Sequence, residues 1–145
     1  MDKVYFKSAK DPLFRSIMYG TVIFLFVLST IQYLTTKTLN TSDIFGHLTL
    51  LLTNGLLISI IEGTNYSIDK QHVYYRSSFL RGKIPINKIT KLEVGKTMWI
   101  GYRPATSRNG IVVHYGKYRK IYFSPRSNEK FVEILSKINE DLIVE

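Results

Sequence analysis

Basic and aromatic side chains are interleaved between residues 99 and 120 of the sequence. The bases are Arg103, Arg108, Lys117, Arg119 and Lys120, and the aromatic residues among them are Trp99, Tyr102, Tyr115 and Tyr118. Lysine and arginine attract phosphate, while aromatic rings favour the membrane–water interface and also stack on nucleic-acid bases. The pattern therefore indicates a surface that contacts an anionic partner, with a solvated basic strand edge as the simpler alternative.

A second candidate pair, His47 and Asn54, lies in a stretch without charged residues. They are seven positions apart in the sequence, so a helix would place both on one face. Polar side chains inside a membrane are candidates for function. The alternative is hydrogen bonding between helices, within a hairpin or a dimer.

No arrangement in the sequence favours catalysis or metal binding. The three histidines, His47, His72 and His114, are far apart, and the chain has no cysteine. Gly-Lys occurs at three places, but none of them lies in a phosphate-binding loop, and the nucleophile-elbow pattern is absent. We therefore expect a protein that is not an enzyme, without catalytic, cofactor or metal sites.

Two long runs without charge occur near the N-terminus. The first has 21 residues, 16–36, and the second has 18, 44–61. A helix needs about 20 apolar residues to cross a bilayer, and neither run shows the one-sided stripe of a surface helix. We therefore predict a transmembrane hairpin over residues 16–62, with a polar connection that contains Lys37.

Two other interpretations of these runs fit less well. Buried helices of a soluble protein would have to be covered by the 84 residues that follow. A secretory signal would have an apolar core of about 7–15 residues and a small-x-small cleavage site. Asp11-Pro12 instead fits a helix start, with Asp11 as cap, after a polar lead-in over residues 1–15.

The distribution of charge predicts the orientation of the hairpin. Residues 64–128 carry 13 basic and 2 acidic side chains, and four bases precede Tyr19. Positive charge next to membrane spans marks the cytoplasmic side, so we expect a multi-pass protein with both termini in the cytoplasm. Because the domain is tethered beside an anionic leaflet, membrane lipid is favoured over nucleic acid as the partner of its bases.

After residue 63 the pattern changes to short alternating segments that are typical of strands. We predict strands near residues 66–68, 73–75, 83–85, 90–94, 111–115 and 120–123. A helix follows, whose apolar side chains recur on one face: Phe131, Ile134, Leu135 and Ile138. Ser124-Pro125 would supply its cap and first-turn proline. Residues 64–145 therefore predict an α+β domain, an antiparallel sheet or barrel closed by a C-terminal helix.

Several short motifs occur along this part of the sequence. They are Tyr66-x-Ile68, Ile84-Pro85-Ile86 followed by Ile89, Ile111-Val112-Val113, Tyr115-Gly116, Ser124-Pro125, and Glu129-Lys130 before Phe131. With these motifs, the sequence resembles the YyaB-like bacterial pleckstrin-homology (PH) family. The resemblance implies a PH fold, commonly with two N-terminal spans, in the bacterial cytoplasmic membrane.

As the function, we expect a non-enzymatic, membrane-anchored interaction module on the cytoplasmic face. Its partner would be a lipid, a protein or a peptide. One branch of the family resembles bacteriocin immunity proteins, so protection of the producing cell's membrane is the alternative function. The identity of the partner and the oligomeric state stay open at this point.

Overall fold

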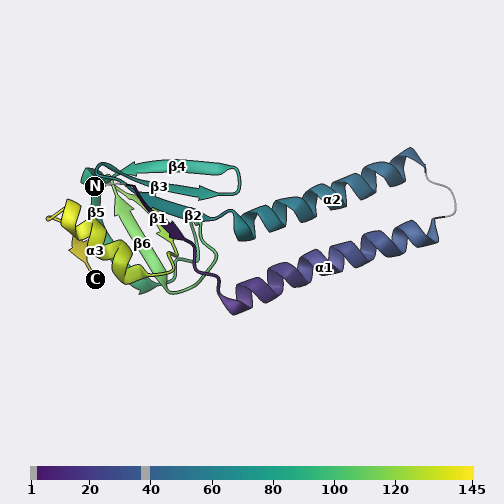
Figure 1. Cartoon of the computed structure of the whole chain (residues 1–145), viewed down its shortest axis with the longest axis horizontal. Coiled ribbons are helices and arrows are strands. Elements are labelled where there is room, and N and C mark those ends of the chain that lie inside the picture. The colour runs from purple at the N-terminus through teal and green to yellow at the C-terminus, as the bar shows by residue number, and fades with distance from the viewer. Residues whose placement is uncertain (1–2, 37–39) are drawn as a thin grey trace.

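The structure of the chain is a computed structural model that describes residues 3–36 and 40–145. Two long helices project together from one end of a small domain of strands and a C-terminal helix (Figure 1). Residues 37–39 of the expected connection, Lys37 among them, lie outside the described part of the chain.

The two helices are α1 (Pro12–Thr35) and α2 (Thr41–Glu62). The side chain of Asp11 accepts a hydrogen bond from the Leu13 amide at 2.9 Å, which satisfies a free donor at the start of α1. At the start of α2 the amide of Asn40 donates to the carboxylate of Asp43 at 3.0 Å. The helix start predicted at Asp11-Pro12 is confirmed.

Neither helix contributes a large share of the domain core. Within the described chain, no residue of α1 is buried, and α2 buries only Asn54 and Ile61. Large apolar side chains are exposed instead, with Phe24 61 % and Phe45 64 % exposed. Both helices are long and apolar enough to cross a membrane. The two helices are therefore not part of the interior of the domain.

The domain contains two four-stranded sheets. The first has the order β1-β2-β3-β4 and is antiparallel throughout, with β1 (Val4–Lys7), β2 (Asn65–Ile68), β3 (His72–Ser77) and β4 (Leu80–Pro85). A short 3-10 helix, η1 (Ile86–Lys88), leads to the second sheet.

The second sheet has the order β7-β6-β5-β8. Its members are β5 (Ile89–Lys96), β6 (Gly110–Tyr115), β7 (Arg119–Phe123) and β8 (Ile143–Val144). β5, β6 and β7 are antiparallel, whereas β8 runs parallel to β5. The six strands predicted from the alternating pattern are all present, and β1 and β8 are additional.

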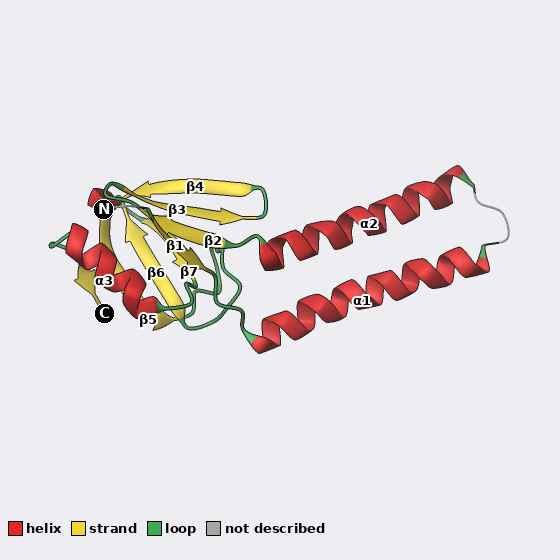
Figure 2. Ribbon diagram, in the orientation of Figure 1, coloured by secondary structure: helices red, strands yellow, loops and turns green. Residues whose placement is uncertain are grey.

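The two sheets do not close into a barrel, which corrects that part of the expected fold (Figure 2). Among the described residues, β1 and β7 are not paired in a ladder, and Ser8 and Pro125, just beyond the ends of these strands, form an isolated bridge. Proline has no amide hydrogen, so it cannot extend a ladder of strand hydrogen bonds. At the other junction, Pro85 ends β4 and η1 turns the chain before β5 begins.

β1 lies in the segment for which the sequence indicates only a polar lead-in. Phe6 pairs with Tyr66 in the ladder between β1 and β2, and it is 9 % exposed. Its ring centre lies 5.3 Å from that of Phe131 in the C-terminal helix. Residues that precede α1 in the sequence are therefore part of the sheet and of the core.

The C-terminal helix, α3 (Asn128–Ile138), packs its apolar stripe against the core. Phe131 and Leu135 are fully buried, and Ile134 and Ile138 are partly buried, which confirms the predicted stripe. The cap, however, is Ser127, whose side chain accepts a hydrogen bond from the Lys130 amide at 3.3 Å. The helix thus begins three positions beyond the predicted Ser124-Pro125 start, because Ser124 is buried in another cluster.

Candidate functional site at the base of the helices

A buried cluster of hydroxyl groups joins the chain entering α1 to the domain. Ser8, Thr106 and Ser124 are 4 %, 1 % and 1 % exposed. The Ser8 hydroxyl oxygen lies 2.9 Å from those of Ser124 and Thr106, and 3.2 Å from that of Tyr66. The Tyr66 hydroxyl donates to the carbonyl of Pro104 at 2.7 Å. Burial raises the pKa of Tyr66, so its hydroxyl stays protonated and able to donate at neutral pH.

Backbone hydrogen bonds extend this junction to the first turn of α1. The Ala9 amide donates to the Ser124 carbonyl at 2.6 Å, and the Asp11 amide donates to the Thr106 carbonyl at 3.2 Å. α1 therefore starts at a defined place, against the end of β7 and the loop over residues 97–109.

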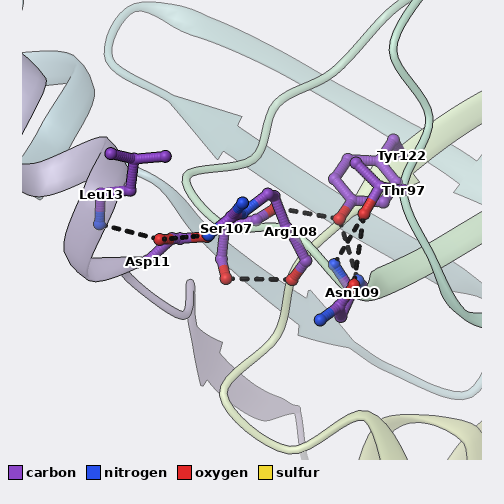
Figure 3. Close-up of polar contacts among 8 residues, drawn as sticks. Asp11, Leu13, Thr97, Ser107, Arg108, Asn109 and Tyr122 are labelled. Carbon is purple, nitrogen blue, oxygen red and sulfur yellow. Dashed lines mark hydrogen bonds and ion pairs between the residues drawn. The ribbon is translucent and has the colours of Figure 1, made fainter.

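Asp11 also forms an ion pair with this loop (Figure 3). The Arg108 Nε atom lies 2.5 Å from one carboxylate oxygen of Asp11, and its Nη2 atom lies 3.3 Å from the other. The hydrogen bond from Arg108 holds the pKa of Asp11 below its ordinary value, so the carboxylate is ionised at neutral pH. The cap of α1 and the loop before β6 are thus joined by one carboxylate.

Hydrogen bonds join the C-terminal end of the loop that carries Arg108 to the start of the loop and to β7 (Figure 3). The Tyr122 hydroxyl donates to the Ser107 carbonyl at 2.9 Å and accepts from the Gly110 amide at 2.9 Å. The Asn109 amide donates to the Thr97 hydroxyl at 2.9 Å. These contacts fix the loop against β7, so that Arg108 reaches Asp11 from a defined backbone position.

The end of α2 is held at the same end of the domain. Glu62 accepts hydrogen bonds from Lys10 and, at 2.8 Å, from Tyr19 of α1. The hydroxyls of Ser59 and Ser78 lie 2.8 Å apart and join α2 to the turn between β3 and β4. We call this end of the molecule the helix base. It comprises residues 7–17, 59–64, 76–81, 97–109 and 124–126.

An open groove of about 420 Å³ lies at the helix base, between the first turns of α1 and the loop over residues 97–109. Its apolar lining comes from Leu13, Phe14, Ile17 and Trp99. Ile17 also belongs to the first charge-free run of the sequence. The groove therefore continues onto the exposed apolar surface of α1.

Arg103 supplies a positive charge to this groove. Its guanidinium carbon lies 5.8 Å from the ring centre of Trp99 and 5.1 Å from that of Tyr122, within the range of cation–π contact. The Nε atom is buried and has no hydrogen-bond partner among the described residues. Arg108, by contrast, is engaged by Asp11.

A second hollow at the helix base, of about 900 Å³, is rich in bases. Lys7, Lys10, Arg15 and Arg126 line it, together with the carboxylate of Glu62. In the sequence, the N-terminal bases indicate only the orientation of the hairpin. Their meeting with Arg126 depends on the pairing of β1 with the sheet, which no local pattern indicates.

The five bases singled out from the sequence do not meet in one place. Arg103 and Arg108 lie at the helix base. Lys117, Arg119 and Lys120 lie in or just after the turn between β6 and β7, next to the ladder pair of Tyr115 with Arg119. At about 3.4 Å per residue, β6 separates the two groups by roughly 17 Å. This turn is at the end of β6 that points away from the helices (Figure 1).

The helix base also carries exposed apolar side chains. Trp99 and Ile100, in the loop over residues 97–109, are 72 % and 90 % exposed. Phe79 and Leu80, at the turn between β3 and β4, are 70 % and 50 % exposed. This turn lies on the side of the domain from which α2 extends (Figure 1). Large apolar side chains in contact with water are typical of a surface that meets a partner or a membrane.

His47 and Asn54 lie in the helix pair, away from the domain. The His47 Nδ1 atom lies 3.0 Å from the Ser29 hydroxyl of α1, and the His47 and Tyr33 ring centres are 6.1 Å apart. The Nε2 atom of His47 and the Oδ1 atom of Asn54 are buried without a hydrogen-bond partner among the described residues. His47 therefore connects the two helices, whereas the Asn54 oxygen is a free acceptor.

Within residues 3–36 and 40–145, no group of three metal-ligating side chains lies close enough to hold an ion. The other two histidines make local contacts. The ring of His72 lies 5.8 Å from that of Tyr74, and the Nε2 atom of His114 lies 3.5 Å from the Glu93 carboxylate.

Two mostly antiparallel sheets with a C-terminal helix, attached at one end to a pair of apolar helices, define a PH-like domain with a candidate membrane anchor. The family model described as Bacterial PH domain matches residues 64–139, and the chain belongs to this family. The resemblance drawn from the sequence motifs is therefore confirmed.

The chain is also similar to a curated protein, "Uncharacterized protein YyaB" of Bacillus subtilis (strain 168). The two are 31 % identical over 102 residues, which cover 70 % of this chain and 68 % of the relative. No solved structure matches the chain. The family description and the name of the relative indicate no catalytic family, and they give no support to bacteriocin immunity.

Proposed function

We propose that this protein is a non-enzymatic interaction module anchored in the bacterial cytoplasmic membrane. α1 and α2 cross the membrane as a hairpin and hold the PH domain against the cytoplasmic leaflet, with both termini on that side. The observation that carries this proposal is the exposure of large apolar side chains along both helices, which leave the domain from the same end (Figure 1).

The charge of the helix base supports the orientation. Lys7, Lys10, Arg15 and Arg126 gather there around one carboxylate, and Arg103 adds a free positive charge. Basic residues next to spans stay on the cytoplasmic side, and each gains about 1 kcal/mol near an anionic leaflet. Together with the exposed Trp99 and Phe79, these bases favour lipid over nucleic acid as the surface that the domain meets.

Labelling of single cysteines tests the topology, because the natural chain has none. We would introduce Thr41→Cys, at the start of α2, and Glu145→Cys separately. A maleimide that does not cross membranes should label Thr41→Cys in intact cells, and Glu145→Cys only after permeabilisation. Both variants should stay in the membrane fraction after alkaline washing. Labelling of Glu145→Cys in intact cells, or release by the wash, would show that the proposal is wrong.

A further inference from the structure

We propose that the groove between α1 and the loop over residues 97–109 binds an anionic phospholipid of the cytoplasmic leaflet. Arg103 binds the headgroup phosphate, and one acyl chain lies along Leu13, Phe14 and Ile17. This inference rests on the proposed function, because it requires the domain to sit against the leaflet that α1 enters.

The shape of the groove supports an occupant that is polar at one end and apolar at the other. Its volume of about 420 Å³ is within the range of ligand pockets, about 300–1,000 Å³. The apolar side formed by Leu13, Phe14 and Ile17 leads directly into the charge-free run of α1. An acyl chain placed there would stay in contact with apolar side chains of α1 until it enters the bilayer.

The charge of the groove supports an anionic headgroup. The guanidinium of Arg103 has no ion-pair partner among the described residues, and its Nε atom is buried without an acceptor. Asp11 brings negative charge to the same groove, but its carboxylate is engaged by Arg108. The net charge left over is therefore that of Arg103. Arginine is well suited to phosphate, since its planar donors match the phosphate oxygens in pairs.

The position of Trp99 supports a groove that lies at the depth of the lipid headgroups. It lines the groove, lies next to Arg103 in cation–π geometry, and is 72 % exposed. Tryptophan is enriched at the membrane–water interface, where its ring is partly apolar and its N–H still reaches polar groups. A water-soluble anion would not need this exposed ring or the adjoining apolar helix surface.

The position of Trp99, the only tryptophan of the chain, provides the readout. The full-length protein would be placed in nanodiscs of equimolar phosphatidylcholine and phosphatidylglycerol. In one set the phosphatidylcholine carries bromine on an acyl chain, and in the other the phosphatidylglycerol carries it. Bromine quenches tryptophan fluorescence on contact, so the ratio of quenching reports which lipid lies in the groove. We expect about a five-fold preference for phosphatidylglycerol, which is the factor for about 1 kcal/mol from one base.

Three variants identify the source of this preference. Arg103→Gln should remove it, while Arg103→Lys, which keeps the charge, should retain most of it. Arg126→Gln lies at the other hollow of the helix base and should leave the preference unchanged. If Arg126→Gln lowers the preference as much as Arg103→Gln does, the effect is general surface charge and the groove is not a site. The unfolding temperatures of both Arg103 variants are measured, so that a loss of preference in a folded Arg103→Gln, together with its retention in Arg103→Lys, reflects charge.

The remaining outcomes separate this inference from the proposed function. Equal quenching by both brominated lipids would overturn the phospholipid site and leave the membrane anchor intact. Absence of quenching by either lipid would show that Trp99 does not reach the bilayer, and would also overturn the site. Labelling of Glu145→Cys from outside the cell would overturn the proposed function itself, whatever the quenching shows.

Discussion

Arg108 and Asp11 are 97 positions apart in the sequence and are joined by two hydrogen bonds at the start of α1. The same Asp11 carboxylate accepts a hydrogen bond from the Leu13 amide, so it caps the helix and holds the loop before β6 at the same time. Paired hydrogen bonds between arginine and a carboxylate have a defined geometry as well as a favourable energy. This contact therefore contributes to the angle at which the helix pair leaves the domain.

We expect Arg108→Gln to lower the thermal stability of the intact protein in detergent micelles. Removal of the guanidinium leaves the Asp11 carboxylate with its cap hydrogen bond alone and loosens the junction. Lys117→Gln, at an exposed base in the turn between β6 and β7, should leave the unfolding temperature unchanged. Equal losses for the two variants would show that the ion pair does not stabilise the junction.

The stability gained from Arg108 should depend on pH. The pKa of Asp11 in the folded protein lies below its ordinary value of 3.8, because Arg108 donates a hydrogen bond to the carboxylate. The contribution is therefore complete above the ordinary pKa and is lost as the pH falls through the folded value. The difference in stability between wild type and Arg108→Gln should be constant near neutral pH and shrink in acid. Unfolding measured over a pH series checks this, and a difference that grows in acid would contradict it.

Phe131→Ala should destabilise the intact protein by about 3–5 kcal/mol, since the ring is fully buried against Phe6 and Phe123. Lys137→Ala removes only an exposed pair with Glu133 within α3, where such pairs contribute about 0.3–0.5 kcal/mol. Denaturant unfolding of the full chain compares the two variants. The chain should include β1, because Phe6 belongs to the core. Similar midpoints for both variants would mean that α3 does not pack as described.

Tyr66→Phe tests the buried hydroxyl cluster. The Tyr66 hydroxyl donates to the Pro104 carbonyl and accepts from the Ser124 amide, so its removal leaves two buried polar groups unpaired. We expect a loss of about 1–3 kcal/mol in the free energy of unfolding. Tyr118→Phe, at a side chain that is 86 % exposed, should change it by no more than about 0.5 kcal/mol. A neutral effect of Tyr66→Phe would mean that water replaces the hydroxyl.

The contact between Ser29 and His47 is suited to a double-mutant cycle. Their atoms lie 3.0 Å apart across the helix pair, and interhelical hydrogen bonds in membranes average about 0.6 kcal/mol. The cycle of Ser29→Ala with His47→Phe, measured by unfolding in micelles, should give a coupling of that size. The control cycle combines Thr30→Ala with His47→Phe. The Thr30 hydroxyl donates to the Phe26 carbonyl of its own helix. Coupling in the control and not in the test pair would contradict the assignment.

Features that depend on nearby residues could be predicted from the sequence. The helix pair follows from two runs without charge, and the start of α1 follows from Asp11-Pro12. The stripe of α3 and the alternation of the inner strands also repeat within a few residues. In each case the deciding interaction is burial of one face or a cap hydrogen bond within one turn, which a short stretch of sequence contains.

Other features were decided by contacts between distant segments. β1 has only four residues, and its place in the sheet depends on pairing with β2, across the whole helix pair. Ser124 matches a helix cap locally, but Ser8 and Thr106 engage it, so Ser127 caps α3 instead. A local pattern cannot distinguish these two serines, because the partners that select one of them come from other parts of the chain.

The candidate site shows the same division. The sequence determined that bases and aromatic residues are concentrated between residues 99 and 120, but not which of them share a surface. Antiparallel pairing of β6 with β7 moves Lys117 and Arg119 to the far end of the strands and leaves Arg103 beside α1. Only the tertiary structure could decide this, because strand direction and packing, and not distance along the chain, determine which charges lie together.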